Sequence, residues 1–197
     1  MTWLRSGLAR LVGCGGIVGS ILWPVALADL AATAGVAAAP ASATLAESSP
    51  LPILPLGISL LLFVAVIVVM ELRAVPVLRL ADLIGDLNVA TAAAVFLLAG
   101  SVGEAGLLGP GFVVLFVGSV IFGVAGLDGR RRPRWGSALI GSGAGGLLAC
   151  MAVVGVLGPT GLAGVTEVAL LSVLFYSSGW AWLGVHLALA RQLAPPA

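Results

Sequence analysis

The sequence contains no lysine, a single histidine and two cysteines, and only 9% of its residues are charged. A soluble domain usually carries about 25% charged residues, so this chain has too few of them to cover a surface that faces water. His186 has no second imidazole with which to share a metal ion. The net charge of +1 makes nucleic acid an unsuitable partner.

Several chemical signatures are also missing. The sequence has no G-x-x-x-x-G-K-[ST] phosphate loop and no H-E-x-x-H zinc motif. The predicted spans do not bring a Ser/His/Asp set together at one depth of the membrane. We therefore expect no catalytic residue, no cofactor and no metal site, and a protein that is not an enzyme.

What the sequence does have is apolar length. Hydrophobic residues make up 60% of the chain, and the mean hydropathy is +1.20. A bilayer core requires about 20 apolar residues per helix. The sequence predicts an all-α membrane bundle, a single domain over residues 1–197 built as three antiparallel hairpins. The predicted spans are residues 11–28, 52–71, 81–101, 107–127, 136–157 and 165–190, the last five forming a core over 52–190.

The arginines indicate the orientation. Cytoplasmic segments of membrane proteins are enriched in Arg and Lys. With the N-terminus inside, this topology puts every arginine on the cytoplasmic side: Arg5, Arg10, Arg73, Arg79, Arg130, Arg131, Arg132, Arg134 and Arg191. The outer segments hold Asp29, Glu47 and Glu104. We expect a multi-pass protein of the inner or plasma membrane with both ends in the cytoplasm.

The first span has two interpretations. Arg5 and Arg10 precede an apolar run, and Ala26-Leu27-Ala28 has the small-x-small pattern of a signal-peptide cleavage site. Cleavage would leave five spans, whereas retention gives six. A weaker alternative is a lipid-modified Cys14, although Arg10 lies too close for a lipobox. Residues 29–51, rich in Ala, Ser and Pro, are expected to form an outer loop.

Polar groups gather where the second span ends and the third begins: Glu71, Arg73, Arg79, Asp82 and Asp86. Asp82 and Asp86 share a helix face because four residues separate them. The plainer interpretation is a solvated, partly paired loop. The alternative is a cation or proton vestibule leading to Asn88 and Thr91. Arg130 to Arg134 form a basic loop that fixes orientation and attracts anionic lipid headgroups.

The last span carries three further candidates. Glu167 and His186 are expected to lie in the outer and inner headgroup layers, with roles in transport as the alternative. Tyr176 begins an unusual stretch that includes Trp180 and Trp182, which lie on nearly opposite helix faces. This stretch predicts either packing, with one indole facing lipid, or a kink that lines a cavity. Trp23 is expected at the water–lipid boundary.

Small residues recur every four positions in the fifth span, at Ser137, Gly141, Gly145 and Ala149. Such a stripe lets a second helix approach closely. It predicts packing within the bundle or self-association. The expected partners are the lipid bilayer and either other membrane subunits or a second copy. The leading functional expectation is a non-catalytic structural or accessory subunit of a membrane assembly, and the alternative is a transporter or channel for small solutes or ions.

Overall fold

The computed structural model describes residues 2–37, 53–72, 80–128 and 132–189. These residues form six long helices and two short 3₁₀ turns: α1 (Thr2–Ala37), α2 (Ile53–Glu71), α3 (Leu80–Val102), η1 (Ala105–Leu107), α4 (Leu108–Ala125), η2 (Gly126–Asp128), α5 (Arg134–Leu157) and α6 (Pro159–Leu189). Each long helix contains a stretch apolar enough to cross a membrane. In lipid a helix satisfies its own backbone hydrogen bonds, which explains why apolar runs of this length fold as helices. The all-α bundle predicted from the sequence is confirmed.

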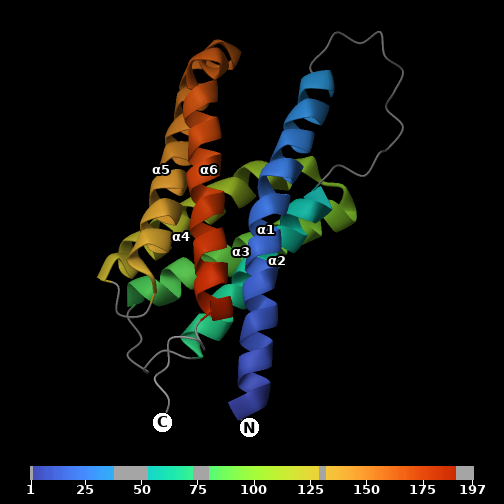
Figure 1. Cartoon of the computed structure of the whole chain (residues 1–197). Helices are drawn as coiled ribbons and strands as arrows, with labels where there is room; N and C mark the ends of the chain where they lie inside the picture. The colour runs from blue at the N-terminus through green and yellow to red at the C-terminus, as the bar shows by residue number, and fades with distance from the viewer. Residues whose placement is uncertain (1, 38–52, 73–79, 129–131, 190–197) are drawn as a thin grey trace.

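The helices follow one another around a ring. Each packs against the next in sequence, and α6 returns to pack against α1. Figure 1 shows α5 and α6 running alongside each other, while α2, α3 and α4 cross behind α1 and α6 at a steep inclination. The ring turns one face of every helix toward a shared interior, and the opposite faces point outward.

Glycines allow the ring to close. A Cβ atom added to Gly13 on α1 would lie 2.6 Å from the carbonyl oxygen of Gly184 on α6. A Cβ added to Gly184 would lie 2.7 Å from the carbonyl oxygen of Gly13. Both contacts are with backbone, which cannot rotate away as a side chain can. Glycine is therefore required on both helices for this approach.

Four of the predicted spans lie within two residues of α2, α3, α4 and α5. The last was predicted from residue 165, six residues after α6 begins, and the first was too short. The span expected at residues 11–28 lies inside α1, which is helical from Thr2 to Ala37 and continues through Pro24. The outer loop expected at residues 29–51 therefore begins as helix, and its remainder from residue 38 onward lies outside the described residues. The apolar stretch of α1 extends from Gly7 to Ala32, long enough to cross a bilayer core.

Candidate functional site

Arg132, the second residue before α5, has a side chain that is only 1% exposed. Its Nη2 atom donates to Glu71 Oε1 at 2.7 Å and to the two carboxylate oxygens of Asp86 at 2.8 and 3.0 Å. Its Nη1 atom lies 3.7 Å from Asp82 Oδ1. We call these four residues the ionic cluster. It joins the start of α5 to the last residue of α2 and the first two turns of α3.

The guanidinium also covers an aromatic ring. Arg132 Cζ lies 4.0 Å from the centroid of the Phe122 ring on α4. A guanidinium over an aromatic face gains electrostatic energy, which is larger where water is excluded. A Cβ added to Gly85 on α3 would lie 2.9 Å from the backbone nitrogen of Phe122. The close approach of α3 to α4 therefore helps to place Phe122 beneath Arg132.

Exposure differs across the ionic cluster. Glu71 is 24% exposed, Asp86 17% and Asp82 4%, so the carboxylates lie between the bundle interior and its surface. Two donors of the buried guanidinium, Nε and Nη1, have no hydrogen-bond partner among the described residues. A buried charge is tolerated only when it is paired. The three carboxylates pair the charge of Arg132, but they leave these two nitrogen atoms without a hydrogen bond.

The ionic cluster corrects two expectations. Asp82 does not belong to a solvated loop, because its side chain is 4% exposed and faces Arg132. Arg132 is buried among carboxylates rather than acting only as a surface charge of the basic loop. Arg73 and Arg79, expected beside these acids, lie outside the described residues. The predicted topology already put Arg132 and the acids on one side of the membrane, but no sequence signal distinguishes Arg132 from its neighbouring arginines.

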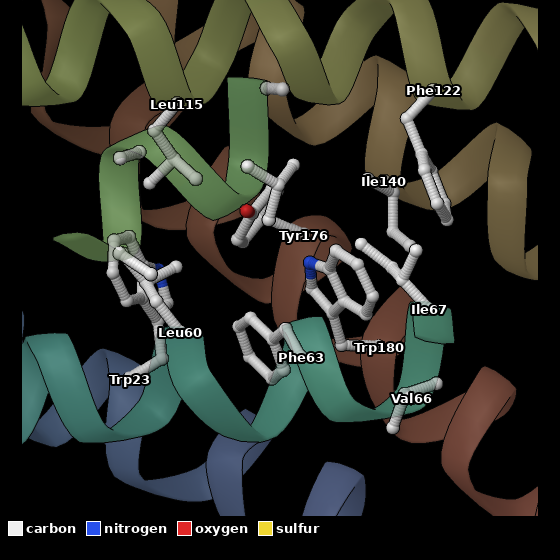
Figure 2. Close-up of a cluster of buried hydrophobic side chains, with 14 of the residues drawn as sticks. Trp23, Leu60, Phe63, Val66, Ile67, Leu115, Phe122, Ile140, Tyr176 and Trp180 are labelled. Atoms are coloured by element: carbon white, nitrogen blue, oxygen red, sulfur yellow. The ribbon is translucent and has the colours of Figure 1, made fainter. Parts of the chain in front are cut away.

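The second feature is an aromatic core in the middle of the ring, shown in part in Figure 2. It comprises Trp23, Phe63, Phe96, Phe112, Phe116, Phe122, Tyr176 and Trp180. The rings of Phe63 and Trp180 stack with centroids 4.5 Å apart. The ring centroids of Trp23 and Tyr176 are 5.7 Å apart. The core also extends to the ionic cluster through Phe122. Its ring centroid lies 5.3 Å from that of Trp180, and the Arg132 guanidinium covers the same ring.

Tyr176 provides a polar group inside this apolar interior. Its side chain is fully buried, and its hydroxyl lies 3.1 Å from Ser119 Oγ of α4, within hydrogen-bonding distance. Trp23 was expected at the water–lipid boundary, but this was wrong, because it is fully buried and its ring packs on Tyr176. In the last span Trp180 is fully buried while Trp182 is half exposed, as their opposite helix faces require.

The remaining polar candidates lie apart from both features. Glu167 and His186 are exposed on α6. Asn88 is half-buried, and its Cβ packs against Gly118 of α4, while Thr91 is exposed. Among the described residues, no three His, Cys, Asp or Glu side chains are grouped so that they could hold a metal ion.

The small residues of α5 serve different surfaces. A Cβ added to Gly123 on α4 would lie 2.5 Å from Gly141 Cα, so α4 and α5 cross at these two glycines. Gly145 has only Val120 nearby, at 3.9 Å from an added Cβ, and Ala149 is exposed. Ser137 and Gly141 of the stripe thus pack within the chain, whereas Ala149 faces outward.

Comparison of the chain with protein-family models, curated proteins and solved structures gave no match.

Proposed function

We propose that this protein is a non-catalytic structural or accessory subunit of a membrane assembly. The observation that supports this most is the aromatic core, in which side chains from five of the six helices fill the described interior. Ile140 and Ala144 of α5 are buried as well. A close-packed interior of this kind resists deformation. A protein built in this way is suited to holding a fixed shape for a partner rather than carrying out chemistry inside the bundle.

The surface on which a partner would sit is proposed to lie on the outer half of α5. Ala149, Val153 and Val156 are exposed there, and Gly155 has no neighbouring atom within 4 Å of an added Cβ. Small residues on an outward helix face permit close approach of another helix. Gly141 is excluded from this surface, because it is already packed against Gly123.

We further propose an inner or plasma membrane location with both chain ends in the cytoplasm. The support comes from charge placement along the described helices. Arg10, Arg132 and Arg134 lie toward the bundle end where α1 and α5 begin, whereas Glu104 and Glu167 lie toward the opposite end. The positive-inside rule assigns the arginine-bearing end to the cytoplasm.

Purification of the tagged full chain from its native membrane in a mild detergent tests the subunit proposal. We expect a partner in fixed stoichiometry, identified by mass spectrometry, that is lost on Ala149→Trp. The matched control is Thr91→Trp, which adds the same indole to an exposed position of α3 and should retain the partner. A chain that is always alone and monomeric would rule out this function.

The second candidate function is transport of small ions or solutes. Two observations favour it: the ionic cluster at one end of the interior, and the hydrogen bond between Tyr176 and Ser119 deeper inside. Purified protein in liposomes should then pass protons, followed with a pH-sensitive dye while valinomycin carries the compensating potassium ions, or potassium ions, followed with the same dye and a protonophore in place of valinomycin. Tyr176→Phe should slow the flux. Flux equal to that of empty liposomes would exclude transport of these ions.

A further inference from the structure

Arg132, just before α5, and Ser137, near its start, hold buried polar atoms that make no hydrogen bond among the described residues. Arg132 Nε, Arg132 Nη1 and Ser137 Oγ all lack a hydrogen bond among the described residues, although both side chains are buried. Ser137 lies in the second turn of α5, and its Oγ would collide with a Cβ added to Gly126, the residue after α4. That same Cβ would lie 3.8 Å from Arg132 Cβ. Arg132, Gly126 and Ser137 thus form one packed corner of the bundle.

This arrangement has an energetic cost while the corner stays closed. A buried polar atom without a partner costs about 1–3 kcal/mol. Water would satisfy all three atoms if the corner separated. The cost of breaking the bonds from Arg132 to Glu71 and Asp86 would be partly offset, since both carboxylates are already in part exposed. The free-energy difference between the closed and the open arrangement is therefore small. It would be larger if every polar atom of the buried ion pair had a hydrogen-bond partner in the closed arrangement.

We propose that the ionic cluster is a reversible latch. In the closed state, which the structure shows, Arg132 bonds Glu71 and Asp86 and covers the Phe122 ring. In the open state Arg132 leaves the carboxylates for water, and Ser137 becomes reachable at this end of the bundle. The contact between Ser119 and Tyr176 is kept in both states. Only Phe122, at the edge of the aromatic core, touches the latch. The latch does not rest on the proposed subunit function, and it uses the same ionic cluster as the transport alternative.

Cysteine reactivity in lipid nanodiscs tests the latch, because both membrane faces are open to a maleimide reagent there. Cys14 and Cys150 are first replaced by alanine, and Ser137→Cys then reports on the latch corner. Ser119→Cys is the matched control, another fully buried serine that lies in the aromatic core. We expect slow labelling of the cysteine at position 137 and none at position 119. Arg132→Gln should raise the rate at position 137 roughly tenfold or more by removing the closed state.

A salt series on the protein with Arg132 intact keeps the test valid if the Arg132 variant fails to fold. Raising the ionic strength from about 0.05 to 0.5 M shortens the Debye length and weakens partly exposed ion pairs. Labelling at position 137 should therefore increase several-fold while position 119 stays unreactive. The latch is refuted if the rate at position 137 responds to neither change. It is also refuted if positions 137 and 119 respond together, since that indicates general loosening of the bundle.

Discussion

Arg132 and Glu71 are separated by 61 residues in sequence, yet Nη2 of one lies 2.7 Å from Oε1 of the other. This contact joins the end of α2 to the start of α5, two helices that are not neighbours around the ring. Asp86 adds α3 to the same guanidinium, and Phe122 adds α4. A single side chain therefore connects four of the six helices at one end of the bundle.

Replacing Arg132 by glutamine should destabilise the fold. Removing one partner of a buried ion pair costs about 3–5 kcal/mol. We expect about 2–4 kcal/mol here, because the partial exposure of Glu71 and Asp86 screens the interaction. The free energy of unfolding can be measured by SDS titration in mixed micelles. The matched control is Arg134→Gln, which removes an exposed arginine bonded to the carbonyl of Leu127. An equal loss in both variants would contradict a special role for Arg132.

Trp23→Ala should be among the most destabilising single changes outside the ionic cluster. The indole is fully buried and contacts the rings of Phe112 and Tyr176. Truncating a buried tryptophan costs about 3–5 kcal/mol, since a cavity remains. Trp135→Ala removes an indole that is 75% exposed and should change stability by about 0.5 kcal/mol or less. The same SDS titration compares them, and similar values would show that Trp23 is not a core residue.

Gly123→Leu should force α4 and α5 apart. The atoms that an added side chain would meet are backbone atoms of Gly141 and Ser137, which cannot move without moving the helix. Overpacking of this kind costs about 1–3 kcal/mol or more. Gly155→Leu on the outer part of α5 has open space and should leave the melting temperature unchanged. A melting temperature unaffected by Gly123→Leu would contradict the glycine crossing.

The packing of α1 leads to a prediction about processing. Trp23 and Ala26 are buried against the rest of the bundle, and Gly13 closes the ring with Gly184. Cleavage after Ala28 would remove these contacts from the mature protein. We therefore predict that α1 is retained, and that the intact mass of protein purified from the membrane includes residues 11–28. A mass that begins after Ala28 would instead support a signal peptide and a five-helix bundle.

The sequence was sufficient to predict the spans because lipid imposes a length and a composition on every crossing helix. The runs at residues 52–71 and 136–157 end within two residues of α2 and α5. The first span was underestimated because Arg10 suggested its start and the small-x-small pattern at Ala26-Leu27-Ala28 suggested its end, whereas α1 continues past both.

The ionic cluster could be predicted only in part. Asp82 and Asp86 are one turn apart on a helix, so their shared face follows from the sequence alone. That Arg132 is their partner depends on how α4 and α5 are tilted against α3, which no local pattern records. The burial of Trp23 was missed for a similar reason: an indole near a span end satisfies the pattern of an interfacial residue whether it faces lipid or the interior.

The most direct test of this account is a double-mutant cycle between Arg132 and Asp86, with unfolding free energies measured for Arg132→Gln, Asp86→Asn and the double variant. Residues in one ion-pair network show coupling energies of about 0.5–3 kcal/mol. We predict a coupling of at least about 1 kcal/mol, with the double variant less destabilised than the sum of the single variants. Strictly additive effects would mean that Arg132 and Asp86 do not interact, and the proposed link among the four helices would be wrong.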